Sequence, residues 1–146
     1  MKIYPPHIVL GSLLLCTILN YFYPYERIIA FPNNLFGIAL AIFSIFLGAK
    51  SFALFKKYKT NIKPDDKPLK FIKGGAYHYT RNPIYVSMLL LLLGIAIVVG
   101  KTIFFIGPAI FFALANFYFI PFEEKNLKKA FGKKYLEYKK EVGRWI

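Results

Sequence analysis

KGGAYHYTRNPIY, residues 73–85, leads directly into a long apolar segment. Asn82 is a favourable N-cap residue and Pro83 suits the first helical position, so we expect a helix to begin here. The amide groups of its first turn carry partial positive charge, which suits an anion. Gly75 allows the backbone to approach a ligand closely, and Arg81 offers planar donors for a carboxylate or phosphate. The stretch therefore predicts an apolar helix with a ligand-binding entrance.

A plainer interpretation of the same stretch is also available. The two glycines form a loop, Tyr77 and Tyr79 belong to an aromatic belt at the membrane surface, and Arg81 is a charge that sets membrane topology. Because short motifs often match by chance, this stretch alone leaves both interpretations open.

The composition indicates a membrane protein. The chain has 146 residues, the length of one domain, and 57% of them are hydrophobic, which exceeds the roughly 45–50% of soluble domains. Each of four apolar segments approaches the roughly 20 residues that cross a bilayer as a helix. These segments are residues 8–23, 35–55, 84–99 and 102–120. We therefore expect a single all-α integral-membrane domain, residues 1–146, with about four transmembrane helices and an amphipathic helical tail over residues 121–146.

The first apolar segment is interpreted as a retained helix rather than a secretory signal. Lys2 is the clear charge ahead of it, and no small-residue cleavage motif follows Tyr23.

The net charge of +13 is concentrated in two segments, one between the second and third apolar segments and one after the fourth. These residues are Lys50, Lys56, Lys57, Lys59, Lys63, Lys67, Lys70, Lys73 and Arg81, followed by Lys125, Lys128, Lys129, Lys133, Lys134, Lys139, Lys140 and Arg144. By the positive-inside tendency both segments are cytoplasmic, which places both termini in the cytoplasm. This distribution favours membrane lipid, not nucleic acid, as the partner of the charge. No obligate protein partner is expected.

Small and polar residues recur on single faces of the apolar segments, where helices in lipid approach closely. These faces are Ser12, Cys16 and Asn20; Gly37, Ala41, Ser44 and Gly48; and Ala109, Ala113 and Asn116. We interpret them as packing faces. Because Cys16 is the single cysteine, no disulfide is expected. The sequence shows neither a candidate catalytic histidine nor a cluster of metal ligands.

The tail carries two adjacent carboxylates just beyond Pro121. We expect Pro121 to open a new helix, because Glu123 and Glu124 then lie in a favourable first turn. They also fall on the inner side of an apolar stripe with helical spacing. The stripe is Leu127, Phe131, Tyr135, Tyr138, Val142 and Trp145. Gly132 is expected to break the tail helix. The alternative is that both acids cap the helix and pair with lysines in solvent.

The third and fourth apolar segments are separated only by Gly100 and Lys101, so they must form antiparallel neighbours. This brings residues 81–85 and 120–124 to the same end. We therefore expect Arg81 and the glutamate pair to meet in one pocket. Residues 56–73 have the length of a lid over it, though a plain tether fits equally well.

Three motifs in this order resemble the integral-membrane methyltransferases that include isoprenylcysteine carboxyl methyltransferase and the phospholipid N-methyltransferases. They are GAYHYTRNPIY at residues 75–85, the pair Glu123 and Glu124, and FGKKYLEYKKEVGRWI at residues 131–146. Together they cover roughly the C-terminal half of the chain. Ala76 stands where the family usually has proline, and the family's usual final proline is absent after Ile146.

The resemblance implies methyl transfer from S-adenosylmethionine to a membrane-associated or lipophilic acceptor, such as an isoprenylcysteine carboxylate or a phospholipid amine. It implies a cofactor site formed by Gly75, Tyr77, Asn82, Pro83, Glu123 and Glu124. Arg81 is expected to hold an acceptor carboxylate or phosphate. If the acceptor is an amine, Glu123 or Tyr85 is the expected base. The alternative function is a non-catalytic four-helix scaffold whose basic cytoplasmic face binds lipid or a partner.

Overall fold

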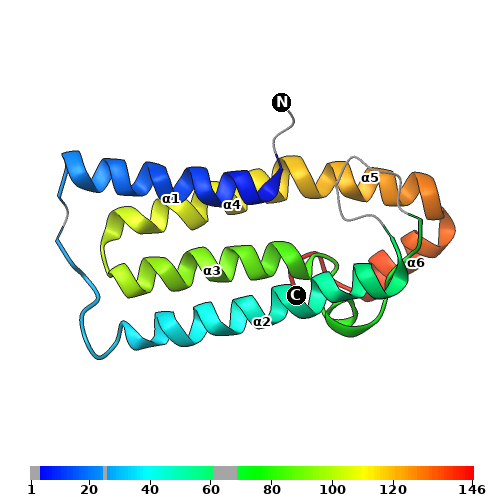
Figure 1. The fold of residues 1–146 in the computed structure, drawn as a ribbon. Coiled ribbons are helices and arrows are strands. Elements are labelled where there is room, and N and C mark those ends of the chain that lie inside the picture. The colour runs from blue at the N-terminus through cyan, green and yellow to red at the C-terminus, as the bar shows by residue number, and fades with distance from the viewer. Residues whose placement is uncertain (1–3, 25, 61–68) are drawn as a thin grey trace.

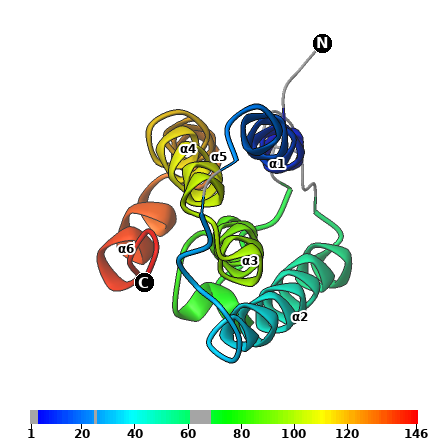
Figure 2. The same ribbon diagram turned by 90° about the vertical axis from the view of Figure 1, so that its left-hand side faces the viewer.

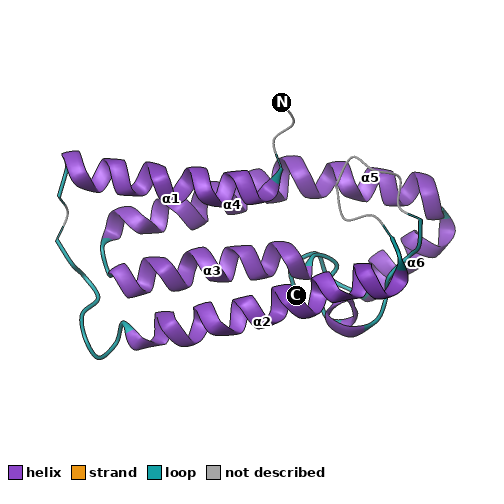
Figure 3. Cartoon of the chain, viewed as in Figure 1, coloured by secondary structure: helices purple, strands orange, loops and turns teal. Residues whose placement is uncertain are grey.

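The structure is a computed structural model that describes residues 4–24, 26–60 and 69–146. Within these ranges it is all-helical, as predicted, with one isolated backbone bridge between Arg27 and Lys101. The α-helices are α1 (Pro5–Phe22), α2 (Leu35–Tyr58), α3 (Pro83–Val99), α4 (Ile106–Leu114), α5 (Ile120–Phe131) and α6 (Lys133–Glu141). Short helical segments are η1 (Gly75–His78), η2 (Thr102–Phe105) and the π-helical turn η3 (Ala115–Phe119). Figure 3 shows how little of the described chain lies outside helices.

Within the described ranges, three helices are long and apolar enough to cross a membrane, namely Pro5–Phe22, Leu35–Tyr58 and the continuous Thr102–Phe131. The fourth, α3, has 17 residues, the lower limit of the roughly 17–25 that span a bilayer. Large apolar side chains on the outer faces of α1 and α2, such as Leu14 and Phe46, are exposed. This arrangement is that of a membrane protein with three to four spanning helices.

The long helices lie side by side, with α1 packed against α4 and α2 packed against α3 (Figures 1 and 2). The connection between α1 and α2 and the turn at Gly100 lie at one end. Helices α5 and α6 lie at the other end, together with residues 69–82, which lead into α3 (Figure 1). The described parts of the two lysine-rich segments therefore share one end of the bundle, as the charge pattern predicted. Which side of the membrane that end faces stays a prediction.

Small residues make close helix contacts, as predicted for the faces that contain Ser12 and Cys16 and that contain Gly37 and Gly48. The third predicted face is wrong, because Ala109 and Ala113 are exposed and α4 packs on α1 through Gly107 instead. A Cβ atom added to Gly37 of α2 would lie 2.5 Å from the carbonyl oxygen of Gly94 in α3. On the other side of the bundle, Gly107 of α4 faces Cys16 and Ser12 of α1. The backbones of α2 and α3 touch directly, which brings the end of α2 against the start of α3, where the site lies.

Gly94→Leu is expected to lower the free energy of unfolding by about 1–3 kcal/mol, because overpacking forces helices apart. A Cβ at Gly94 would lie 2.8 Å from the Gly37 carbonyl oxygen. Gly11→Leu is the matched control, since a Cβ at Gly11 meets no atom within 4 Å. Thermal unfolding in detergent measures both. Equal midpoints for the two variants would contradict this account of the α2–α3 contact.

The prediction that Pro121 opens a separate helix is wrong, because the chain is helical without interruption over Thr102–Phe131. Pro121 lies in the first turn of α5, directly after the π-helical turn. Proline has no amide hydrogen, and its ring clashes with the carbonyl one turn earlier in an α-helix. The wider turn, in which the Ile120 amide donates to the Ala115 carbonyl, accommodates the ring. The predicted break at Gly132 is confirmed, with φ at 52°.

Candidate functional site

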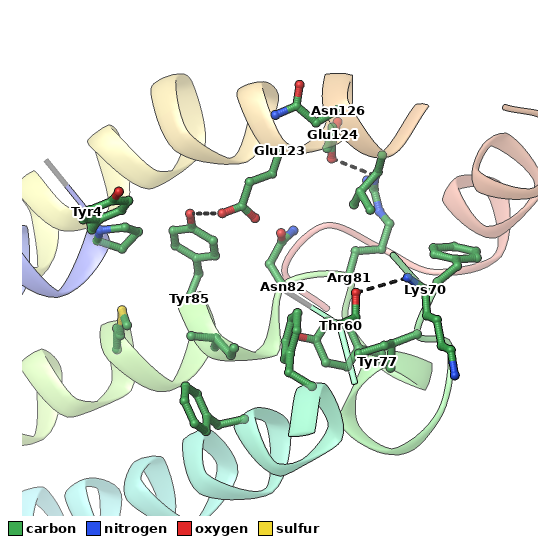
Figure 4. Close-up of a pocket in the computed structure, with 18 of the residues that line it drawn as sticks. Tyr4, Thr60, Lys70, Tyr77, Arg81, Asn82, Tyr85, Glu123, Glu124 and Asn126 are labelled. Atoms are coloured by element: carbon green, nitrogen blue, oxygen red, sulfur yellow. Dashed lines mark hydrogen bonds and ion pairs between the residues drawn. The ribbon is translucent and has the colours of Figure 1, made fainter. Parts of the chain in front are cut away.

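A cavity of about 470 Å³ lies at the end of the bundle that holds α5 and α6. Its walls come from the starts of α1 and α3, the end of α2, residues 70–72, η1, and helices α5 and α6. Figure 4 shows Tyr85 and Asn82 facing Glu123 across this space, with Arg81 and Glu124 beside them. Its volume falls within the roughly 300–1,000 Å³ of small-molecule sites.

Arg81 and the glutamate pair meet in this cavity, as predicted. The Nη1 atom of Arg81 lies 2.7 Å from Oε1 of Glu124 and 3.3 Å from the hydroxyl oxygen of Tyr135. The Arg81 side chain is only 8% exposed. Its Nε atom is buried and has no hydrogen-bond partner among the described residues. Since a buried donor without a partner is costly, this atom suits an acceptor group on a ligand.

Glu124 is held by three cationic side chains. Besides Arg81, the Nζ atom of Lys139 lies 2.9 Å from Oε2, and the Nε atom of Arg144 lies 3.2 Å from Oε1. Opposite charges at these distances stabilise the ionised carboxylate. Both oxygens of Glu124 are thus engaged within the protein, and one of them binds Arg81. A direct contact between Glu124 and a cofactor stays a prediction.

Glu123 has a different environment, although it is the adjacent residue. The hydroxyl of Tyr85 donates to its Oε1 at 2.6 Å. Within the described ranges no lysine or arginine comes within ion-pair distance of it. Figure 4 shows its carboxylate pointing toward Tyr85 across the cavity. The two glutamates therefore differ: Glu124 is paired with cationic side chains, whereas Glu123 points into the cavity.

Aromatic rings form the wall near α2. Tyr77 of η1 packs edge-on to Phe55, with ring centroids 6.0 Å apart, and its carbonyl accepts a hydrogen bond from the Tyr138 hydroxyl. Burial, and then the charge of Glu123, raise the pKa of the Tyr77 phenol. Burial raises the pKa of Tyr138 to about 12. Both phenols are therefore neutral at physiological pH, and their ring faces can attract a cation.

The N-cap of α3 differs from the sequence-based prediction. Asn82 occupies the N-cap position, but its side chain makes no cap bond. Its Nδ2 atom instead donates to the carbonyl of Arg144 at 2.9 Å, while the Arg81 amide donates to the Gly143 carbonyl at 3.0 Å. The chain after α6 thus covers this helix start. An anion at the first turn of α3 stays a prediction.

Two predicted cofactor residues do not line the cavity. Gly75 begins η1 with φ at 63°, and a Cβ there would lie 3.0 Å from the Leu54 side chain. Pro83 is buried in the first turn of α3. Both shape the backbone that carries Tyr77 and Arg81, and a direct contact with a cofactor stays a prediction for them.

Several lining residues were missed by the sequence reasoning. Tyr4 lies just before α1, His7 in α1, Asn126 in α5 and Thr60 just beyond α2. The Thr60 hydroxyl accepts hydrogen bonds from the amides of Leu69 and Lys70, both at 3.1 Å. Residues 61–68 of the predicted lid lie outside the described residues. No sequence signal marks these positions, because they reach the cavity only through packing of distant elements.

Comparison with known proteins agrees with the sequence resemblance. A sequence model of the family described as phospholipid methyltransferase matches residues 32–134. A Haemophilus influenzae protein described as uncharacterized is 36% identical over 63 residues, which are 43% of this chain and the whole of that protein. The family match contains the second, third and fourth apolar helices together with Arg81 and both glutamates. The chain therefore belongs to the phospholipid methyltransferase family of membrane proteins.

Proposed function

We propose that the protein transfers a methyl group from S-adenosylmethionine to a lipophilic acceptor at the end of the bundle that holds α5 and α6. The observation that carries the proposal is the convergence of Arg81, Tyr85 and Glu123 on one cavity, with a buried guanidinium Nε atom left without a partner among the described residues. Arg81 lies just ahead of α3, Tyr85 lies in its first turn and Glu123 lies in α5, about 40 positions further along the sequence.

The residues present fit this cofactor. S-adenosylmethionine has a carboxylate, an ammonium, a sulfonium and a ribose diol. The Nε atom of Arg81 would donate to the carboxylate, and the Glu123 carboxylate would pair with a cationic group. Tyr77 and Phe55 would present ring faces to the sulfonium or the adenine. When bound, the cofactor supplies a methyl group already activated for displacement by the positive sulfur.

The protein's own part is to align the groups and to exclude water. Tyr85 fixes the rotamer of Glu123 through its 2.6 Å hydrogen bond. Glu124, with Lys139 and Arg144 on its other side, keeps the Arg81 guanidinium against the cavity wall. If the acceptor is an amine, Glu123 is placed to remove its proton. If the acceptor has a carboxylate or phosphate, Arg81 is its expected partner.

A lipophilic acceptor is supported by the apolar part of the wall. Pro6 of α1, Phe52 of α2 and Met88 of α3 line the same cavity as the charged residues. A ligand with a polar head and an apolar tail would contact both kinds of surface at once. The acceptor is therefore proposed to be a lipid or a lipidated molecule, with phospholipid amines and isoprenylcysteine carboxylates as the two candidates.

The experiment is to incubate purified protein with methyl-labelled S-adenosylmethionine and a membrane extract, and to measure cofactor binding by calorimetry. We expect saturable binding that S-adenosylhomocysteine competes away, and label entering the lipid or lipidated-protein fraction. The fraction that takes the label identifies the acceptor class. No binding heat together with salt-sensitive lipid binding would favour the non-catalytic scaffold and overturn the proposal.

A further inference from the structure

The π-helical turn Ala115–Phe119 sets the rotation of α5 relative to α4. In an uninterrupted α-helix, residues eight apart differ by roughly 80° around the axis, whereas residues seven apart nearly coincide. The π turn takes up about one extra residue, so Asn116 and Glu124 come to share a face. One consequence is visible in the contacts, because a single side chain, Arg144, bonds to both of them.

Asn116 accepts hydrogen bonds from two neighbouring residues that follow α6. Its Oδ1 atom lies 3.2 Å from Nη1 of Arg144 and 3.1 Å from Nε1 of Trp145. The Trp145 ring also packs on Phe112 of α4, with ring centroids 5.0 Å apart. Residues 143–145 are thereby attached to the helix that carries the glutamate pair, and we refer to these residues as the clasp.

The other side of the clasp contacts Glu124 of α5 and residues 80–82, which lie just ahead of α3. Arg144 donates to Glu124 from both Nε and Nη2, at 3.2 Å each. The Arg144 carbonyl accepts hydrogen bonds from Thr80 and Asn82 at 3.1 and 2.9 Å. The Gly143 carbonyl accepts the amide of Arg81 at 3.0 Å. Arg81 is thus held at its backbone by the clasp and at its side chain by Glu124, which the clasp also binds.

We propose that Asn116 is a positioning residue, which fixes the clasp and through it the guanidinium of Arg81. This inference rests on the proposed function, since its purpose is to hold Arg81 ready for the donor carboxylate. Asn116 does not line the cavity itself. Removing its side-chain acceptor leaves the Nε1 donor of Trp145 without its partner, and leaves Nη1 of Arg144 only the 3.4 Å contact with the backbone carbonyl of Asn116. The attachment of the clasp to the helix is therefore expected to loosen.

The clasp can be observed without any cofactor, because Trp145 is the single tryptophan of the sequence. We expect Asn116→Leu to shift tryptophan emission to longer wavelength and to increase its quenching by acrylamide. Asn116→Asp keeps an oxygen acceptor at the same place and is expected to restore the wild-type spectrum. Asn20→Leu is the matched control, since it removes an asparagine acceptor, here of Lys101, at the opposite end of the bundle.

The second readout is the affinity for S-adenosylmethionine, measured by calorimetry on the same four proteins. We expect Asn116→Leu to weaken binding roughly tenfold, the effect of losing a hydrogen bond to a charged group, and Asn116→Asp and Asn20→Leu to bind as wild type does. Unchanged acrylamide quenching in Asn116→Leu would contradict the claim that Asn116 holds the clasp in place. Altered quenching with unchanged affinity for S-adenosylmethionine would contradict the claim that Asn116 positions Arg81. A wild-type protein that binds no S-adenosylmethionine overturns the proposed function, while the quenching comparison still decides the clasp.

Discussion

Glu123→Gln is expected to lower methyl transfer to an amine acceptor by about 10²–10⁴-fold, the range for loss of a positioned acid–base group. Glu123 is the cavity carboxylate that no lysine or arginine of the described ranges offsets. Glutamine keeps its size and still accepts the Tyr85 hydroxyl hydrogen, so the cavity shape is retained. The measurement is the rate of label transfer from methyl-labelled cofactor at saturating acceptor.

Glu137→Gln is the matched control for this variant, because Glu137 is an exposed residue of α6 outside the cavity. It makes the same chemical change on the same end of the bundle, and we expect full activity from it. Wild-type turnover in Glu123→Gln would remove Glu123 from the reaction and leave it as a residue that packs against Tyr85.

Arg81→Lys is expected to weaken S-adenosylmethionine binding by about a hundredfold or more. Lysine keeps the charge, but it cannot engage Glu124 and also offer a second, unpartnered donor as the planar guanidinium does through Nε. The buried ion pair with Glu124 also loses the planar hydrogen-bonding geometry of the guanidinium. Removing one partner of a buried pair costs about 3–5 kcal/mol, so Arg81→Ala is expected to lower thermal stability as well.

Calorimetry at constant temperature and detergent checks this expectation. Arg27→Lys is the control, since Arg27 is exposed and lies at the opposite end of the bundle, next to Lys101. If the Arg81→Lys variant binds the cofactor as tightly as the wild-type protein does, the guanidinium group has no role in binding.

The sequence was sufficient to predict the helices and the convergence of the two motifs. Apolar length defines the spans, and the short connection through Gly100, Lys101 and η2 makes α3 and α4 antiparallel neighbours. That topology alone brings Arg81 and Glu124 to one end, where they lie 2.7 Å apart. Likewise, Gly132 breaks the tail helix as expected, because it adopts a positive φ that favours glycine.

The different environments of the two glutamates could not be predicted from the sequence. Whether Glu123 or Glu124 meets cations depends on the rotation of α5, which the π-helical turn changes by about one residue. The turn also explains why Pro121 does not end the helix. No residue composition is typical of a π turn, so the sequence did not predict this one. It also did not predict the hydrogen bonds that the clasp donates to Asn116.

The most direct test of the account locates the cofactor on the chain. Ultraviolet crosslinking of labelled S-adenosylmethionine to the purified protein, followed by peptide mapping, reports which residues it touches. We predict adducts in the peptides that contain Tyr77 and Tyr85, suppressed by excess S-adenosylhomocysteine and by Arg81→Lys. Competable adducts confined to the other end of the bundle, around residues 23–34 and Gly100, would contradict the central claim.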